Sequence, residues 1–497
     1  MSFAGRLRQL ASETAIYGVS NILGRLLTFL LFPFYTQVFT PDEYGIVSIV
    51  YAAFIFLNIV YQYGMESAYL KYAAEAETEV DRQRVFSTAL ASLLASSAVL
   101  SLLLVALRGP FAALMDLPSV WTYLFYYVAV ILTLDALAAL PLAALRLASR
   151  PLAFALARLG GIVVNVAVNI WLIVGQGMGV EAVFIANVAS SATTLLLVAP
   201  TYVRYLRPRF DGALWRTLLA FGLPFLPGGL GYAVSDRVNI FFLSRMDPAR
   251  IETLYPRAAG AAQPDAYSEY VVGLFGGGMK LAALMMLVVQ MFRYAWQPFF
   301  LQRARDADAP QLFARVFTLL TAASLLVWLG VSFFAQELVA LPLPGGRRLI
   351  AEAYWPGLVI VPVALLAYVF QGWYYTFSAG AYLEEKTKYF VHCTLVGSVV
   401  AVTVNALLVP HYGMVAAAWA TTLAYATMAV MLWAIVRRFY PVPYEWPRVL
   451  GAFVLAALLM GAWTALSALQ VWWIEGGLLL GFVGALGAAG VIPLRRG

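Results

Sequence analysis

Amide and charged side chains recur at intervals of three, four or seven residues inside long apolar segments of this 497-residue chain. Residues at these intervals lie on the same face of an α-helix, so each set forms a polar stripe on an otherwise apolar helix. Amide groups on such a stripe can hydrogen-bond a polar ligand, and charged groups can bind ions. The stripes are Asn21 with Arg25; Asn58 with Gln62 and Glu66; Arg158 with Asn165 and Asn169; and Gln290 with Arg293.

Basic residues outnumber acidic residues within these apolar segments. A charge at the centre of a bilayer costs roughly 2.5–3.5 kcal/mol on insertion scales, so embedded charges usually face a cavity or a partner. We therefore expect a cationic cavity that binds an anionic substrate, such as a lipid phosphate or diphosphate. The basic residues that we expect to bind substrate are Arg25, Arg158, Arg237, Lys280 and Arg293, and the embedded acids are Glu66, Asp135 and Asp236.

These polar residues also have a structural interpretation. Asparagine and glutamine side chains hydrogen-bond neighbouring transmembrane helices, with a mean contribution of about 0.6 kcal/mol. Asp236 and Arg237 are adjacent and can form an ion pair, and Arg315 can extend its guanidinium from a helix end to the membrane surface. The embedded acids can instead carry a proton or a sodium ion, and the sequence leaves this energy coupling open.

The elements that position these stripes are predicted transmembrane helices. Hydrophobic residues make up 63% of the chain and charged residues 11%, against about 45–50% and about 25% in soluble domains. This composition excludes an ordinary soluble protein and a disordered chain. Fourteen apolar segments are long enough to span a bilayer: 14–39, 44–66, 86–107, 120–144, 152–175, 180–203, 214–243, 270–300, 312–336, 353–378, 389–409, 413–436, 448–469 and 472–492.

The distribution of basic residues orients these segments. With the N-terminus in the cytoplasm, 20 of the 32 Lys and Arg residues fall in cytoplasmic loops, 6 in outside loops and 6 within segments. Because positive residues are enriched in cytoplasmic loops, this distribution favours fourteen spans with both termini in the cytoplasm. A miscounted helix would exchange the two sides of every later loop and remove this bias.

A motif shared by two distant segments indicates an internal duplication. Asn169 is followed eight residues later by Gly177–Met178, and Asn405 is followed at the same interval by Gly413–Met414. The second copy lies 236 residues and six predicted helices after the first, so we expect parallel repeats about an axis along the membrane normal. This predicts an all-α membrane protein with two six-helix halves around a central cavity and a C-terminal helix pair: residues 1–203, 204–440 and 441–497.

One predicted helix and one loop depart from this regular pattern. The helix 214–243 contains Pro224, Pro227 and several glycines, which favour a kink or a break in mid-membrane. Irregular backbone at this depth is tolerated where it lines a cavity. The longest outside loop, residues 245–269, has no role that the sequence identifies.

The sequence contains no motif of a common membrane enzyme. It has one Cys and two His residues, and it lacks a nucleotide-binding loop, a metal-ligand cluster and a Ser–His–Asp set. We therefore expect a transporter with no resident metal or cofactor, and not an enzyme. A glycan-processing membrane enzyme is a weaker hypothesis, because the chain offers no site for that chemistry.

Seven short motifs carry a family resemblance: Glu13–Gly18, Phe29–Tyr35, Phe39–Gly45, Asp236–Arg237, Tyr294–Phe299, Glu385–Tyr389 and Val404–Ala418. In their order and phase they resemble the polysaccharide biosynthesis flippases of the multidrug/oligosaccharidyl-lipid/polysaccharide exporter superfamily. The resemblance covers roughly residues 10–440.

The resemblance implies a flippase that moves undecaprenyl-diphosphate-linked oligosaccharide from the cytoplasmic to the outer leaflet by alternating access. The embedded cations would hold the diphosphate, the polar stripes would face the sugar, and the lipid tail would stay in the bilayer. The cargo would be a repeat unit of O-antigen, capsule or exopolysaccharide in the cytoplasmic membrane of a bacterium or archaeon. Expected partners are membrane lipids, a polysaccharide polymerase and glycosyltransferases, but no nucleic acid. The resemblance does not specify the glycan or the oligomeric state.

Two other functions in the same superfamily are alternatives. An ion-coupled multidrug exporter moves cations and usually has twelve spans, so the Arg-rich interior and the last helix pair argue against it. A peptidoglycan-precursor flippase shares the expected fold and is harder to distinguish.

Overall fold

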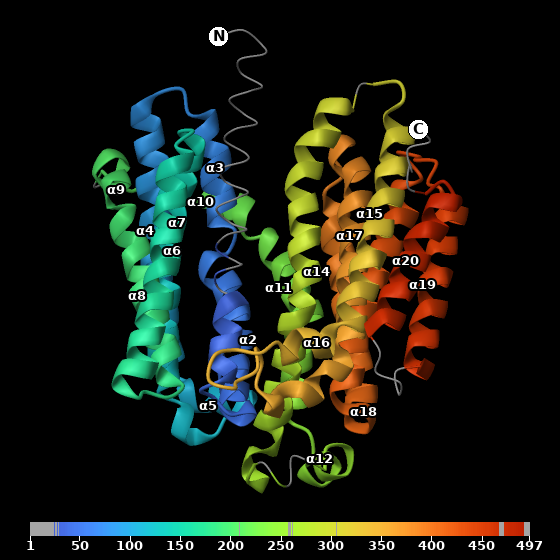
Figure 1. Cartoon of the computed structure of the whole chain (residues 1–497). Helices are drawn as coiled ribbons and strands as arrows, with labels where there is room; N and C mark the ends of the chain where they lie inside the picture. Colours follow the sequence, from blue (N-terminus) through green and yellow to red (C-terminus); the bar gives the residue numbers. More distant parts are fainter. Residues whose placement is uncertain are drawn as a thin grey trace. The chain divides into compact units, whose positions relative to one another are not determined.

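The computed structural model describes residues 24, 27, 29–207, 209–256, 260, 262–304, 306–466 and 472–491. Two candidate site residues, Asn21 and Arg25, lie outside the described residues. Within the described part of the chain the regular structure is helical, apart from one isolated β-bridge between Pro342 and Arg348 (Figure 1). The prediction of an all-α protein is confirmed.

The chain folds as two compact units. The first contains Met1–Ala233 and Ile240–Gly273, and the second contains Val234–Asn239 and Leu274–Gly497. The helix α11 therefore contributes to both units, because its middle residues belong to the second unit.

The first unit is built mainly from long helices joined by short connections. The closest helix pairs in this unit are α7 with α8, α4 with α6, and α6 with α8. Its helices are α2 (Pro41–Gln62), α3 (Met65–Glu75), α4 (Glu79–Ala106), α5 (Arg108–Leu114), α6 (Leu124–Leu147), α7 (Pro151–Ile170), α8 (Glu181–Leu197), α9 (Ala199–Tyr205), α10 (Gly212–Gly222), α11 (Phe225–Leu243) and α12 (Pro248–Leu254).

The second unit contains two of the longest helices of the described chain. α17 packs against α18 and α15, and α19 packs against α15 and α20. The helices are α14 (Tyr267–Arg303, whose first turns lie in the first unit), α15 (Ala309–Phe333), α16 (Ala335–Ala340), α17 (Val361–Leu383), α18 (Lys388–Val436), α19 (Trp446–Leu466) and α20 (Trp472–Ala488), with the 3₁₀ segment η4 (Glu352–Ile360) before α17.

Ten helices of the described chain are long and apolar enough to cross a membrane, and α8 with α9 forms an eleventh candidate, bent by 42°. The protein is thus a multi-pass membrane protein, but the predicted count of fourteen spans is not confirmed. One difference is α18, whose 49 residues cover two predicted segments. Another is α20, whose 17 residues are fewer than the roughly 20 that a span needs.

The predicted break in the helix 214–243 is present. α10 ends at Gly222 and α11 begins at Phe225, on either side of Pro224. A second break, between α2 and α3, lies against it: Gly64 has φ +74°, and a Cβ atom on Gly64 would lie 2.2 Å from the carbonyl oxygen of Gly222. Such a distance is far below van der Waals contact. Only glycine at position 64 therefore allows the two breaks to pack this closely.

The two copies of the Asn–Gly motif have the same local structure. Asn169 and Asn405 are both fully buried, and each side-chain amide donates to a carbonyl four residues earlier, at 3.0 Å and 2.7 Å. Eight residues after each asparagine, Gly177 and Gly413 have φ of +66° and +57°. Because this left-handed conformation favours glycine, it explains why both copies carry glycine where the helix direction changes.

Candidate functional site

A polar cavity of about 450 Å³ lies within the first unit. We call it the α6–α8 cavity, because α6, α7 and α8 provide most of its wall and α2 and α3 complete it. It brings together four of the predicted site residues, namely Asn58, Gln62, Glu66 and Arg158. Its other polar wall residues are Asp135, Arg146, Asn187, Ser190, Ser191 and Thr194.

The stripe Asn58–Gln62–Glu66 belongs to two helices and not to one. Asn58 and Gln62 lie on α2, whereas Glu66 lies in the first turn of α3, after the break at Gly64. The Gln62 amide donates to Asn58 Oδ1 at 2.8 Å. All three side chains still line the α6–α8 cavity, so the break redirects the helix without removing Glu66 from the polar wall.

Two carboxylates in the cavity have direct partners. Glu66 forms an ion pair with Arg146 of α6. Ser191 of α8 donates a hydrogen bond to Asp135 Oδ1 of α6 at 2.7 Å, and Arg158 attracts this carboxylate electrostatically. Buried charges need such partners, because an isolated ion in an apolar region is strongly unfavourable.

The α6–α8 cavity contains acidic as well as basic side chains. Its described wall contains two carboxylates, Glu66 and Asp135, and two guanidinium groups, Arg146 and Arg158. The wall therefore has equal numbers of acidic and basic side chains and is rich in both donors and acceptors. Such a wall suits a ligand with many hydroxyl groups and a localised anionic group.

Asn165 and Asn169 belong to a hydrogen-bond network beside this cavity. Tyr35 donates to Asn169 Oδ1 at 3.0 Å, and the Asn165 amide donates to Asn187 Oδ1 at 3.2 Å. The Asn187 amide in turn bonds the Tyr51 hydroxyl. Of these residues only Asn187 lines the cavity, so the network fixes the orientation of a cavity residue.

Two of the predicted residues of the second unit are adjacent in sequence and interact. Arg237 Nε lies 2.8 Å from Asp236 Oδ2, and Tyr425 donates to Asp236 Oδ1 at 2.8 Å. Asp236 and Arg237 thus form the ion pair that their adjacent positions suggested. Gln290 is buried, with 7% of its surface exposed.

Lys280 is a partly buried cation on α14. Within the described part of the chain it makes no hydrogen bond or ion pair, and the positive charge of Arg237 repels its ammonium group. An ammonium group without such a partner has its three N–H donors available to an anion.

Arg293 lies in a smaller pocket of about 220 Å³ whose wall is mainly aromatic. Its guanidinium lies 4.9 Å from the ring centre of Tyr375 and donates to the hydroxyl of the same residue at 3.4 Å. We call this the Arg293 pocket.

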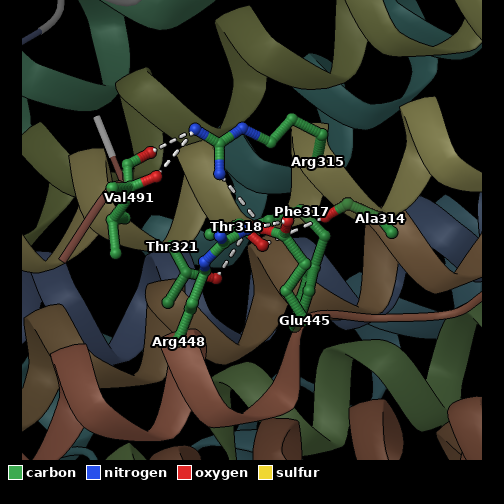
Figure 2. Close-up of polar contacts among 9 residues, drawn as sticks. Ala314, Arg315, Phe317, Thr318, Thr321, Glu445, Arg448 and Val491 are labelled. Carbon is green, nitrogen blue, oxygen red and sulfur yellow. Dashed lines mark hydrogen bonds and ion pairs between the residues drawn. The ribbon is translucent and has the colours of Figure 1, made fainter. Parts of the chain in front are cut away.

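Arg315 does more than extend to the membrane surface. It forms an ion pair with Glu445 at 3.2 Å and donates to the carbonyl oxygens of Gly490 and Val491, after the end of α20, at 3.1 Å and 2.8 Å (Figure 2). Glu445 also pairs with Arg448 of α19. One arginine of α15 thus connects the start of α19 and the end of α20.

The environment of Glu445 favours its charged form. Burial alone raises the pKa of its carboxyl group, but hydrogen bonds from Thr318 and Arg315 and the charges of Arg448 and Arg315 outweigh burial. The pKa of Glu445 is therefore held below its usual value.

Several residues of the cavity wall were not among the predicted site residues. Asn187 and Ser191 lie four residues apart on α8, as do Ser190 and Thr194, so the helical spacing that revealed the other stripes was present there. Arg146 gave no such signal, because it lies near the end of α6 and resembles a loop residue that orients the chain.

Comparisons with known proteins agree with this architecture. A family model described as "Polysaccharide biosynthesis protein" matches residues 36–263. The resemblance to polysaccharide biosynthesis proteins is confirmed. The region that resembles these polysaccharide biosynthesis proteins includes α2 to α8, and hence every element that lines the α6–α8 cavity. No curated protein matches the chain by sequence.

Solved structures of transporters have a similar fold. An inward-facing multidrug resistance MATE family transporter of the MOP superfamily matches with a TM-score of 0.66 and 14% identity, over 84% of this chain and 94% of that chain. The Lipid II flippase MurJ in an inward closed conformation matches with a TM-score of 0.67 and 12% identity, over 96% and 100%. At these identities the likeness concerns the fold alone.

Proposed function

We propose that this protein is a flippase that carries an undecaprenyl-diphosphate-linked oligosaccharide across the cytoplasmic membrane, from the cytoplasmic to the outer leaflet. The observation that carries this proposal is the α6–α8 cavity, which combines amide, hydroxyl, carboxylate and guanidinium groups on membrane-spanning helices. The match to the polysaccharide biosynthesis family supports the assignment of a glycan as cargo.

Each group of the cavity wall has a part in this function. Asn58, Gln62, Asn187 and Asp135 offer the donors and acceptors that sugar hydroxyls need. The guanidinium of Arg158 binds phosphate oxygen through charge-assisted hydrogen bonds. A polar wall at this depth replaces the water that the head group loses when it enters the membrane, while the polyprenyl tail stays in lipid.

In this proposal, transport proceeds by alternating access, in which the binding site opens to one side of the membrane at a time. Both termini lie in the cytoplasm. Polysaccharide polymerase and glycosyltransferases act after and before the flippase, since they use and make its lipid-linked cargo. Embedded cations that the cavity does not contain, Lys280 above all, assist by attracting the diphosphate.

The proposal is tested in cells that lack the native gene for this protein. Surface polysaccharide and lipid-linked precursor are measured after expression of the wild type, Arg158→Gln, Asp135→Asn, or the control Arg303→Gln, which changes an exposed arginine paired with Asp306. We expect the two cavity variants to insert normally, to lose surface polysaccharide and to accumulate precursor, and the control to resemble the wild type. Normal polysaccharide with both cavity variants would contradict the proposal.

The fold shared with a Lipid II flippase and with a multidrug transporter makes two other cargoes worth the same test. If the protein instead carried a peptidoglycan precursor, its depletion would cause cell lysis without affecting surface polysaccharide. A multidrug exporter would change resistance to cationic drugs and leave both glycans intact.

A further inference from the structure

The two ends of α18 meet at a pair of aromatic rings. The helix runs from Lys388 to Val436 and changes direction at Gly413, whose φ is +57°. The ring of Tyr389, in its first turn, stacks on the ring of Phe439, just after its end, at 6.1 Å between ring centres. The start and the end of α18 therefore lie next to each other within the second unit.

Basic side chains surround this contact. Lys386 Nζ lies 4.0 Å from the ring centre of Phe439, and the guanidinium carbon of Arg437 lies 4.5 Å from that of Trp433. At these distances each cation is attracted to the face of a ring, which holds it near the contact. We call the following residues the α18 basic patch: Lys386, Lys388, Tyr389, Trp433, Arg437, Arg438 and Phe439.

The four cations of the α18 basic patch form no ion pair with any residue that the structure describes. Basic residues near the start of α4 and the end of α9 differ in this respect, because Arg84 pairs with Asp211 and Arg204 pairs with Glu79. Two acids, Glu384–Glu385, lie on the turn before the patch, so the patch keeps an excess of positive charge. This charge is available to an anionic ligand.

Exposed apolar side chains extend from the patch along both parts of α18. In the first part Leu395 and Val399 are 43% and 65% exposed, and in the second part Leu423 and Val430 are 41% and 52% exposed. Leu423, Val430 and Arg437 follow one another at intervals of seven residues, so they share one helix face. Because α18 is apolar and long enough to cross a membrane, these two stripes suit contact with acyl chains.

We propose that the α18 basic patch binds an anionic phospholipid of the cytoplasmic leaflet, with the cations at its phosphate oxygens and the acyl chains along the two exposed stripes. Clusters of Lys and Arg directly beside a transmembrane helix attract anionic head groups, and aromatic rings favour the same depth of the membrane. A free phosphate would use the cations alone, and an acidic protein would leave the apolar stripes without a partner. The combination therefore favours a phospholipid.

This site differs from that of the transported cargo. It belongs to the second unit, and it shares no residue with the α6–α8 cavity of the first unit. Its assignment to the cytoplasmic leaflet follows from the proposed orientation of the termini. The bound lipid would connect the two ends of α18 through one head group, whatever glycan the protein carries.

The test is native mass spectrometry of the full-length protein with added phosphatidylglycerol or phosphatidylcholine. We expect the wild type to bind its first phosphatidylglycerol at least about fivefold more tightly than phosphatidylcholine. Lys386→Gln/Arg437→Gln should remove most of this preference, whereas Lys386→Arg/Arg437→Lys, which keeps both charges, should retain it. The matched control Arg82→Gln/Arg204→Gln removes the same charge from two arginines that pair with Glu79, and should leave the preference unchanged.

Four outcomes would overturn the inference. Equal affinity of the wild type for the two lipids would exclude an anionic-lipid site. An equal loss of preference in the patch variant and in the matched control would show a general effect of positive charge. Displacement of phosphatidylglycerol by an equal concentration of inorganic phosphate would assign the cations to a free anion. Its displacement by an equal concentration of a soluble glutamate-only peptide would assign the patch to an acidic protein.

Discussion

Ser191 of α8 donates a hydrogen bond to Asp135 of α6 at 2.7 Å, at the wall of a cavity that also contains Arg158. A carboxyl group that accepts a hydrogen bond from one hydroxyl and lies near one guanidinium retains acceptor capacity for a ligand. The hydrogen bond connects α6 and α8 through two residues that are 56 positions apart in sequence.

Loss of the Asp135–Ser191 hydrogen bond should reduce transport more than stability. We expect Ser191→Ala to lower the transport rate about tenfold, because the bond to a charged group contributes about 1.5–3 kcal/mol and orients Asp135. Ser191→Thr, which keeps the hydroxyl, should retain most activity. Equal rates for Ser191→Ala and the wild type would show that the orientation of Asp135 does not matter.

Lys280 should act as an anion-attracting group. Its ammonium makes no ion pair in the described part of the chain and is repelled by Arg237, so Lys280→Ala should strongly reduce transport while membrane insertion is retained. Lys280→Arg should keep part of the activity because it keeps the charge. The measurement is the initial rate of precursor flipping, with Arg303→Gln as the control, and full activity of Lys280→Ala would refute the role.

Gly64 should be essential for the packing of the two helix breaks in the first unit. Its φ is +74°, and a Cβ atom added to it would lie only 2.2 Å from the Gly222 carbonyl oxygen, so Gly64→Ala should destabilise the protein by at least about 2 kcal/mol. Gly109→Ala is the matched control, since nothing lies within 4 Å of its added methyl group. Thermal unfolding in detergent measures both, and similar transition temperatures would contradict this account.

The ion pair of Glu445 with Arg315 should make stability depend on pH in a defined direction. Because the pKa of Glu445 is lowered in the folded state, its contribution is complete above the unfolded-state pKa of about 4.5 and is lost as pH falls through the folded-state pKa. The difference in transition temperature between the wild type and Glu445→Gln should therefore be largest near neutral pH and shrink below about pH 4.5. A difference that stays constant between about pH 7 and about pH 3.5 would rule out this linkage.

The sequence predicted the features that depend on local chemistry. Pro224 marks a helix break because it lacks an N–H, and Gly177 and Gly413 mark changes of helix direction because their φ is positive. The stripe of Asn58, Gln62 and Glu66 identified three residues of the cavity wall from spacing alone.

Features that depend on tertiary contacts were not predictable in this way. Nothing near Glu66 in sequence indicates Arg146, its partner 80 residues later, and nothing near Arg315 indicates the carbonyl groups after α20. Gly64 alone gave no signal for a break, because its conformation is stabilised by the packing of Gly222 against it.

The most direct test of the central claim is flipping of a defined undecaprenyl-diphosphate-linked oligosaccharide in proteoliposomes that contain only this protein. The measured quantity is the initial rate at which a membrane-impermeant glycosidase gains access to glycan from the inner leaflet. The account predicts rapid exposure with the wild type and with Arg303→Gln, and at least about a tenfold slower rate with Arg158→Gln. No flipping by the wild type, or an unchanged rate in Arg158→Gln, would contradict it.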